Sequence, residues 1–555
     1  MRALGLPRLA FLALTLPLVG SAVGVGCGAS EDLALEDEDD DDNGSDGTTA
    51  NNGGGPGDTT GFTGNDDLPG STCEGTGNSY IGCEFWPTVT ANNVWSIFDF
   101  AVVVANASPN PVEATVERDG SVVTTATIPA ESLETIYLPW VPALKGDDAD
   151  ECGAATPINA SVKLSGGAYH LTTNAPVTVY QFSALQYAAT GGPPGKSWAG
   201  CPGDLPCRFG PPVGCFSYSN DASRLLPTTA LTGNNRVAGW EGWSGTNPQS
   251  PLDMGGSLTI TGTEDDTDVR VTLSATAQLR AGGGLAAASG NSTVNFTLQA
   301  GEVAELVGTG QSDFSGSVVA ADKPVQVITS MPCVNIPSTQ PACDHIEETV
   351  FPAETLGQRY FVTRPAHPNR GTAPHHVRIY GNVDGTSLSY PGERPPGAPT
   401  SIDAGQVVDL ANVNVDFEVV GDNAFSVGTF MLGASIVDPG TGEKGDPSQS
   451  FATAVEQYRT DYIFLAPTDY DENYVQITGP ADAVLTLDGQ PVTVAGTPVA
   501  SAFSTWRVLL GSGNNGAHRL TSDQPVGIQV AGYGQFTTYL YPGGSDLLQI
   551  APPPD

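Results

Sequence analysis

The sequence predicts an all-β protein made of tandem, immunoglobulin-like β-sandwich modules, and three observations carry the prediction. Many segments alternate apolar and polar residues, which is the period of a half-buried strand. One alternating segment, residues 171–183, recurs three times along the chain. No segment shows a convincing 3.6-residue period, which would indicate an amphipathic helix. Because each unit could instead supply two four-stranded blades, a β-propeller is the alternative fold.

The recurring segment reads LTTNAPVTVYQFS at residues 171–183, and its echoes lie at residues 318–330, 418–430 and 519–531. Each copy has two alternating runs around a short corner, where Asn, Asp and Pro are turn-forming residues. The corners lie 148, 100 and 101 residues apart. Two nearly equal steps indicate a tandem array. We interpret each copy as two strands with a tight connection that close a module.

The charge of the chain narrows its possible partners. The 555 residues carry a formal net charge of −40, from 21 basic and 61 acidic residues. An acidic surface repels phosphate, so the charge argues against a nucleic-acid partner and against electrostatic docking to anionic lipid. At about 100 to 200 residues per domain, this length accommodates about three to five domains.

The N-terminus has the pattern of a secretory signal peptide over residues 1–26. Arg2 and Arg8 supply a positive n-region, and an apolar run with small residues near its end follows. The run ends at Cys27 in a context that resembles a bacterial lipobox, where the Cys thiol is acylated and becomes the mature N-terminus. Cleavage elsewhere is the alternative, because Gly24 stands where Leu is usual. We therefore expect a lipid anchor in a membrane and a bacterial cell-envelope location, at the outer membrane or cell surface.

Residues 27–72 predict an acidic, Gly- and Asp-rich tether. Ten acidic residues lie between Glu31 and Asp46, and no Lys or Arg occurs from Leu9 to Glu117. Like charges repel one another and little apolar surface is available for burial, so this segment would stay solvated. Its expected role is to hold the body away from a membrane surface.

Eight cysteines remain once Cys27 is assigned to the lipid. They are Cys73, Cys83, Cys152, Cys201, Cys207, Cys215, Cys333 and Cys343. An exported protein meets an oxidising compartment, so we expect four disulfides, with Cys73–Cys83 and Cys333–Cys343 as local pairs. The alternative is that some of these thiols stay reduced or bind metal.

The repeats and the shifts in composition predict the domain organisation. After the signal peptide and tether, we expect a β module at residues 73–190, a Cys-rich insertion at 191–235, β modules at 236–340 and 341–437, a linker at 438–449 and a last β module at 450–555. A second recurring mark opens the later modules, at Leu226-Pro227, Phe351-Pro352 and Phe451. The insertion accounts for much of the longer first step.

Five strand phrases of the body carry a family resemblance. They are GCEFWPT at residues 82–88, FAVVVANASPNP at 100–111, LTTNAPVTVYQFSAL at 171–185, FPAETLGQRYFV at 351–362 and AHRLTSDQPVGIQVAGYG at 517–534. They resemble the N-terminal domain of the IgGFc-binding protein, a family that also occurs in many exported bacterial proteins. The resemblance covers roughly residues 73–555 and implies a secreted, β-rich recognition or adhesion module. It transfers no catalytic residue and no mapped Fc contact.

Catalytic and metal-binding motifs are not found in the sequence. Neither a zinc-protease helix signature, nor a G-x-S-x-G elbow, nor a P-loop is present. We therefore expect no catalytic residues, no metal and no cofactor. The densest group of possible ligands, Cys343-Asp344-His345 with Glu347 and Glu348, we interpret as a disulfide-flanked acidic loop.

Histidine and tryptophan offer weaker signals. His170 and His518 stand at similar places before the repeated corner, which favours a structural cross-strand role. Tryptophans often line carbohydrate platforms, although in small sandwiches most of them fill cores. The candidates for such a platform are Trp140, Trp198, Trp240 and Trp243.

The sequence therefore predicts a non-catalytic, lipid-anchored envelope protein whose β modules serve recognition or adhesion of an extracellular protein or glycan. A structural surface stalk and a secreted glycan or peptide hydrolase are the alternatives. We expect the binding residues in the non-repeating parts, which are the Cys201–Cys215 insertion and the Cys333–Cys343 loop.

Overall fold

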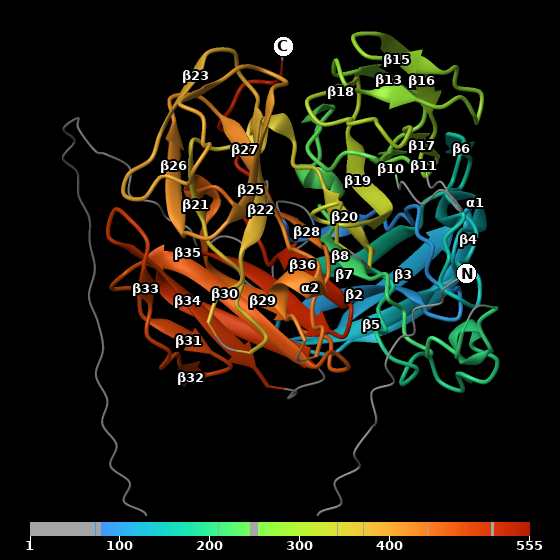
Figure 1. Cartoon of the computed structure of the whole chain (residues 1–555), viewed down its shortest axis with the longest axis horizontal. Coiled ribbons are helices and arrows are strands. Elements are labelled where there is room, and N and C mark those ends of the chain that lie inside the picture. Colours follow the sequence, from blue (N-terminus) through green and yellow to red (C-terminus); the bar gives the residue numbers. More distant parts are fainter. Residues whose placement is uncertain are drawn as a thin grey trace, which may run out of the picture. The chain divides into compact units, whose positions relative to one another are not determined.

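Strands dominate the computed structural model, as the sequence predicts (Figure 1). The model describes residues 73, 79–208, 210–244, 253–340, 342–369, 371–440, 442–511 and 516–554. Its helical elements are single turns, namely α1 (Pro142–Lys145), α2 (Ala434–Val437), η1 (Pro202–Asp204), η2 (Thr228–Ala230), η3 (Ala353–Thr355) and η4 (Val455–Gln457). No described helix is long and apolar enough to cross a membrane. The predicted signal peptide, Cys27 and the tether up to residue 72 lie outside the described residues.

The first two modules each combine two antiparallel sheets, which share one long strand in the first module and are separate in the second. The first contains β1 (Gly82–Phe85), β2 (Phe100–Asn106), β3 (Val112–Arg118), β4 (Ser121–Ile128), β5 (Ser132–Leu138), β7 (His170–Ser183) and β8 (Asp221–Arg224). The second contains β6 (Val162–Leu164), β9 (Asn234–Arg236), β12 (Ser257–Gly262), β13 (Thr267–Thr272), β16 (Thr293–Leu298), β17 (Val303–Val307), β18 (Val318–Ala321), β19 (Val325–Val334) and β20 (Asp344–Thr349). Two short ribbons belong to the second module, β10 (Trp243–Ser244) with β11 (Asp253–Met254) and β14 (Gln278–Leu279) with β15 (Ala288–Ser289).

The last two modules repeat this plan. The third contains β21 (Arg359–Val362), β22 (His375–Gly381), β23 (Thr386–Ser389), β24 (Ser401–Ile402), β25 (Val407–Val413), β26 (Phe417–Gly421), β27 (Phe425–Phe430) and β28 (Gln449–Phe451). The fourth contains β29 (Arg459–Leu465), β30 (Glu472–Pro480), β31 (Leu485–Leu487), β32 (Gln490–Pro491), β33 (Thr497–Pro498), β34 (Phe503–Leu510), β35 (Ala517–Gly534) and β36 (Thr537–Pro542). The module cores are apolar and alternate with the strand period, as in β3 and β13.

The recurring segment is the strand that passes from one sheet of a module to the other. In the first module the N-terminal half of β7 pairs with β3, and its C-terminal half pairs with β2 and β8. In the fourth module β35 divides in the same way between β29 and β30. In the middle modules the corner interrupts the strand, which gives β18 with β19 and β26 with β27. The prediction of two strands with a tight connection holds in the middle modules and is corrected in the first and fourth, where β7 and β35 continue through the corner as one strand.

The corner contains the same hydrogen bond in all four modules. An Asn or Asp side chain two residues before the Pro or Ala accepts a backbone N–H from a neighbouring strand or turn, at 2.7 to 2.9 Å. The pairs, acceptor first, are Asn174 with Glu113, Asp322 with Asp268, Asp422 with Ser387 and Asp523 with Val484. The side chain satisfies a backbone group at the place where the strand leaves the first sheet. This shared bond explains why the corner carries the clearest repeat in the sequence.

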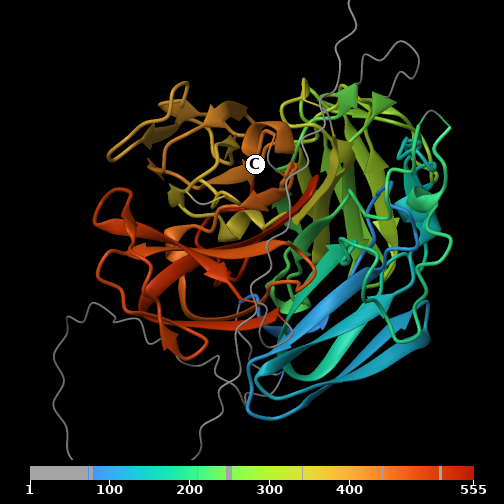
Figure 2. The ribbon, with the colours of Figure 1, turned by 60° about the horizontal axis from the view of Figure 1, so that its bottom comes forward.

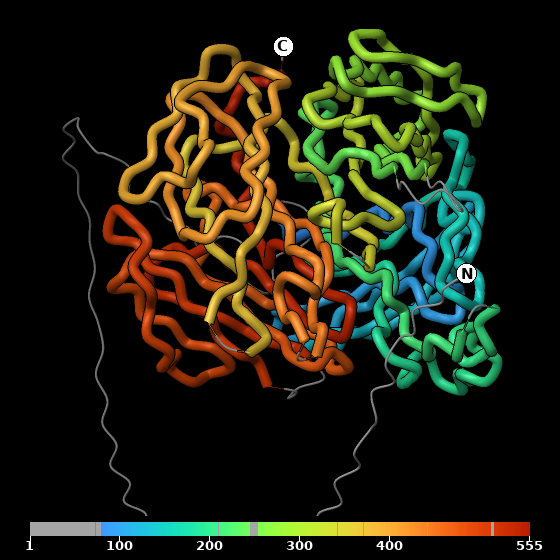
Figure 3. The backbone as a smooth tube through the Cα atoms, in the orientation of Figure 1, coloured from blue at the N-terminus to red at the C-terminus, as the bar shows by residue number. Residues whose placement is uncertain are grey.

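Each crossing strand is followed by a strand that pairs with it and also meets the other modules. We name these four strands, β8, β20, β28 and β36, the axial strands. β8 contacts β20 and β36, and β28 contacts the same two strands. The modules are therefore arranged cyclically around the axial strands, as Figure 2 and the tube of Figure 3 show. Each module is a pair of sheets, as the sandwich prediction requires, while the cyclic arrangement resembles the propeller alternative.

The axial strands run in the same direction and are joined by carboxylates. Asp221 Oδ2 accepts the backbone N–H of Glu347 at 3.1 Å and of Gln449 at 3.0 Å, and Oδ1 accepts that of Leu540 at 3.2 Å. One side chain of β8 thus binds β20, β36 and, through Gln449, β28. Asp344 repeats the pattern with the N–H groups of Asn220 and Thr538. Strands that meet around an axis do not form a complete set of backbone hydrogen bonds with one another. The two aspartate side chains therefore accept the backbone N–H groups that the axial strands leave without a backbone partner.

The two ends of the body meet to close the cycle. Ser79 forms an isolated bridge with Asp546, and Tyr80 N–H donates to the carbonyl of Ser545. The residues that lead into the first module therefore pack beside those that follow the last axial strand. Residues 438–449, predicted as a linker, are instead part of this packed body, because Asp446 and Gln449 are fully buried in it.

Candidate functional site

Four connections lead from the crossing strands into the axial strands. They are residues 184–220, 335–343, 431–448 and 535–536. Because the axial strands share one direction, these connections gather at the end of the axis where the strands begin. We name this surface the loop face. The two non-repeating parts that the sequence singled out, the Cys201–Cys215 insertion and the Cys333–Cys343 loop, belong to two of these connections.

Direct contacts join the four connections into one surface. Gly433 N–H donates to the carbonyl of Ile336 at 2.9 Å, which links the third connection to the second. Lys444 forms an isolated bridge with Gln535, which links the third to the fourth. Gln535 N–H also donates to the hydroxyl of Tyr187 at 2.8 Å, which links the fourth to the first. The loop face is therefore a continuous structure rather than four separate tips.

Disulfides hold the longest connection in one conformation. Cys201 pairs with Cys215, and Cys207 pairs with Cys152 of the first module. Cys201 and Cys215 also pack with Trp95 and Phe98, so the base of the insertion has an apolar core of its own. Above this base the insertion exposes large apolar side chains, Leu205 at 49% and Val213 at 38%. Exposed apolar side chains on a rigid loop provide anchor residues for a partner surface.

The other two disulfides are the local pairs that the sequence predicts, Cys333–Cys343 and Cys73–Cys83. Cys333–Cys343 closes the second connection, where Pro337, Ser338 and Thr339 are exposed. Beside them, the Ser435 hydroxyl donates to the side-chain oxygen of Gln340 at 2.7 Å. This part of the loop face offers hydroxyl and amide groups, whereas the insertion offers apolar ones.

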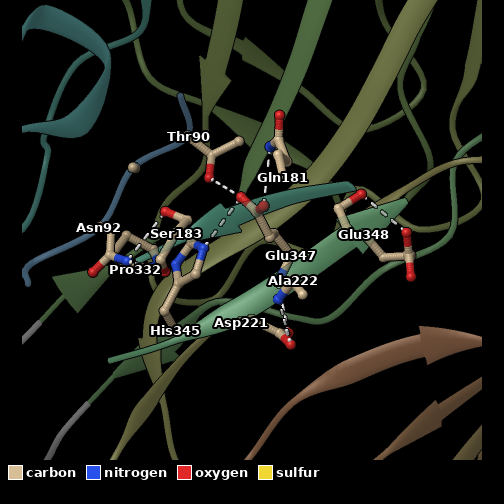
Figure 4. A network of polar contacts seen from close by, with 12 residues as sticks. Thr90, Asn92, Gln181, Ser183, Asp221, Ala222, Pro332, His345, Glu347 and Glu348 are labelled. Carbon is tan, nitrogen blue, oxygen red and sulfur yellow. Dashed lines mark hydrogen bonds and ion pairs between the residues drawn. The ribbon is translucent and has the colours of Figure 1, made fainter. Parts of the chain in front are cut away.

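A buried polar layer lies beneath the loop face (Figure 4). Glu347 of β20 is its centre: Thr90 Oγ1 donates to Glu347 Oε2 at 2.6 Å and Gln181 Nε2 to Oε1 at 2.9 Å. His345 Nε2 lies 3.3 Å from Glu347 Oε2. The side chains of His345 and Glu347 are fully buried. The interpretation of this acidic group as a loop is corrected, because the residues form an axial strand between modules.

Burial shifts the protonation of the acids in this layer. It raises the pKa of Glu348 on β20 to about 8, although the nearby Arg224 and several hydrogen bonds oppose the shift. It likewise raises the pKa of Glu305 on β17 to about 8. Asp344 and Asp446 both have pKa values well above the usual range through burial, and Asp344 raises that of Asp446 further by charge repulsion. Removal from water disfavours the charged carboxylate in each case.

The comparison with protein families agrees with this geometry. A family model described as IgGFc binding protein matches residues 221–532, which is more than half of the chain. The chain belongs to this family. The matched region begins at the first residue of β8 and ends within β35, so it spans the second and third modules, most of the fourth and the axial aspartate Asp221. No curated protein and no solved structure matches the chain.

Membership of the IgGFc binding protein family places the chain among binding and recognition domains. The buried layer is consistent with a role in assembly. His345, Glu347 and Glu348 have no exposed surface through which a substrate would reach them. In the part of the chain that the structure describes, no group of three or more His, Cys, Asp or Glu side chains is arranged to hold a metal ion.

The predicted histidines and tryptophans have structural surroundings. His170 lies 2.7 Å from Glu84 and stacks on Trp86, and His518 lies 2.8 Å from Asp488. These are the cross-strand roles that the sequence favours. The four tryptophans do not form one platform, since Trp140 and Trp198 pack in one apolar cluster whereas Trp240 and Trp243 pack against another.

The sequence did not single out the axial aspartate Asp221, and it placed Asp344 in an acidic loop instead of at the axis. Charged residues are usually placed on the surface, and each of these acids begins a short strand that contains further polar residues. Their signal is positional, because Asp221 and Asp344 both stand a few residues before the Leu-Pro or Phe-Pro mark that opens a module. An acid shortly before this mark, found in two modules, is therefore a signal for a residue that meets the axis.

Proposed function

We propose that this protein is a lipid-anchored, cell-envelope recognition protein that binds an extracellular protein ligand through its loop face. The observation that carries the proposal is the convergence of all four connections at one end of the axis, with a disulfide-held insertion that exposes Leu205 and Val213. The anchor part of the proposal is supported by the signal-peptide pattern, by Cys27 and by the acidic tether in the sequence.

A protein ligand fits the chemistry of this surface better than a nucleic acid or an anionic lipid. The net charge of −40 repels polyanions, whereas the apolar insertion and the exposed hydroxyls of the second connection suit a mixed protein surface. Protein interfaces place a few apolar anchors within a polar surround. The family description makes the Fc region of immunoglobulin G the first ligand to test.

The test uses the purified protein and an IgG Fc fragment in a surface-binding assay, followed by a panel of extracellular proteins. We expect saturable binding that Leu205→Asp and Val213→Asp weaken at least tenfold, because a charge in an apolar contact must be desolvated. Val484→Asp is the matched control, since Val484 is 62% exposed on the fourth module away from the loop face. Binding that survives both insertion variants, or no saturable binding to any panel member, would refute the loop-face proposal.

The anchor is tested separately in cells. Metabolic labelling with palmitate is expected to mark the wild-type protein and to fail with Cys27→Ala. A labelled Cys27→Ala protein would contradict the anchor without affecting the loop-face proposal.

A further inference from the structure

Arg224, the last residue of β8, has a buried guanidinium without a hydrogen-bond partner among the described residues. Arg224 is the largest of the fully buried side chains, with 0% exposure. Its Nε, Nη1 and Nη2 atoms have no hydrogen-bond partner among the described residues. A guanidinium carries five N–H donors, and buried polar groups are almost always paired. An unpaired, fully buried Arg therefore requires a partner that the described residues do not supply.

Aromatic rings cover the faces of this guanidinium. Its Cζ lies 5.2 Å from the centre of the Phe351 ring and 5.5 Å from that of Tyr80. Rings attract the cation through their π faces, but they cannot accept the N–H groups, which point outward in the plane of the guanidinium. Phe351 comes from the lead-in of the third module and Tyr80 from that of the first, and Tyr80 lies where the cycle closes.

The other polar groups nearby are already engaged. The Tyr180 hydroxyl donates to the carbonyls of Ile463 and Gly543, and the Tyr462 hydroxyl donates to that of Val526. Both tyrosines belong to the electrostatic surroundings of Arg224. Their protons are committed to backbone acceptors, so they provide no negative charge for the guanidinium.

Glu348 is the acid that interacts most strongly with Arg224. Its Oε1 accepts three hydrogen bonds, from the backbone N–H of Thr349 at 2.9 Å, the hydroxyl of Ser223 at 3.0 Å and the backbone N–H of Arg224 at 3.3 Å. Its Oε2 has no hydrogen-bond partner among the described residues. Burial raises the pKa of Glu348 to about 8, so at neutral pH the carboxyl is protonated and carries a free O–H donor. Arg224 then remains a buried cation without a counter-ion.

We propose that a single small inorganic anion of the size of chloride binds beside the buried guanidinium of Arg224, held by its in-plane N–H groups. A monatomic anion accepts several donors at once and neutralises the cation, which bridging water does not. The anion binds the folded cycle and not the unfolded chain, so it stabilises the closed arrangement of modules by mass action. This inference does not depend on the loop face or on its ligand.

The test compares thermal unfolding of the full protein in sodium chloride and in sodium gluconate at equal ionic strength and pH 6.5. We expect the unfolding temperature to rise by about 2 °C or more over the chloride titration, and bromide to reproduce the rise. Arg224→Met removes the donors and should abolish the chloride dependence. Arg270→Met is the matched control and should keep it, because Arg270 is an exposed Arg on β13.

The variant Glu348→Gln tests how the charge of Glu348 affects the binding of the anion. The groups that face Arg224 are Glu348 on β20, Tyr80 before β1, Tyr180 on β7 and Tyr462 on β29. Of these groups, Glu348 has a pKa of about 8, so above about pH 8 its carboxylate replaces the anion as the counter-ion of Arg224. The effect of chloride on the unfolding temperature of the wild type should therefore weaken above about pH 8. Glu348→Gln stays neutral and keeps an N–H donor, so it should retain the chloride effect at this pH.

Crystals soaked in bromide give a second readout, which requires no variant. An anomalous peak at the Arg224 guanidinium supports the proposal. Equal unfolding temperatures in chloride and gluconate, or ordered water without a bromide peak at Arg224, would overturn it.

Discussion

Glu305 on β17 gives the protein a stability that depends strongly on pH. Its side chain is fully buried, Oε1 accepts Ala91 N–H at 2.9 Å, and Oε2 has no hydrogen-bond partner among the described residues. Burial raises the pKa from 4.5 to about 8. The folded state therefore holds the proton more tightly than the unfolded chain does. The contribution of the protonated Glu305 to the free energy of unfolding is fully present below about pH 4.5 and is lost as the pH rises to about 8.

The size of the effect follows from the shift. One pKa unit corresponds to about 1.4 kcal/mol, so the change from 4.5 to about 8 corresponds to about 4 to 5 kcal/mol between these limits. Glu305→Gln removes the titration and keeps the shape. Its amide oxygen still accepts Ala91 N–H, and its amide nitrogen faces Ser257 and Thr259, whose hydroxyls have no other partner in the described part of the chain.

Urea unfolding at pH 5, 7 and 9 measures this prediction. Wild type and Glu305→Gln should have similar free energies of unfolding at pH 5, and the variant should be more stable at pH 9 by several kcal/mol. Glu113→Gln is the control, because Glu113 is exposed on β3 and should leave the pH dependence unchanged. Parallel pH profiles for wild type and Glu305→Gln would refute the reasoning.

Three further predictions follow from the same structure. Asp221→Asn leaves one oxygen for four backbone N–H donors and should lower the free energy of unfolding by about 3 to 5 kcal/mol in urea, whereas an effect below 1 kcal/mol would contradict the axial role. Asp322→Ala and Asp422→Ala each remove the exposed corner bond and should cost about 0.5 to 1.5 kcal/mol, with the larger value for Asp422→Ala because Asp422 Oδ1 also accepts the side-chain amide of Asn423. Cys201→Ser with Cys215→Ser should speed proteolysis within the insertion and weaken ligand binding, and unchanged binding would show that a fixed insertion is unnecessary.

The repeated parts of the fold were predictable because their signal is local. Alternation and the Asn, Asp and Pro corner residues identify the crossing strands, and the same Asx side chain makes the same bond in every module. What the pattern does not contain is the direction of the chain after the corner. A hairpin and a change of sheet use the same residues, so only the pairing of β7 with both β3 and β2 decides between them.

The propeller alternative includes a cyclic arrangement, but the contacts that close the cycle were not predictable, because they join residues at opposite ends of the body. Tyr80 meets Ser545, and Asp221 meets Leu540. The axial acids also oppose the usual rule that Asp and Glu face solvent. They are buried because strands that meet around an axis leave backbone N–H groups without a ladder partner, and a carboxylate accepts several of them at once.

The arrangement separates the residues that build the protein from those open to a ligand. The corner bonds recur in all four modules and the axial carboxylates in two, so they specify how sheets cross and how modules join. The connections of the loop face differ in every module, from the two-residue turn at 535–536 to the disulfide-held insertion at 184–220. A scaffold that fixes four strand ends side by side tolerates such differences, because only the ends of each connection must stay in place. Specificity in this family member is therefore expected to follow the connections, and exchanging the insertion for a short turn should alter ligand choice while leaving the axial strands intact.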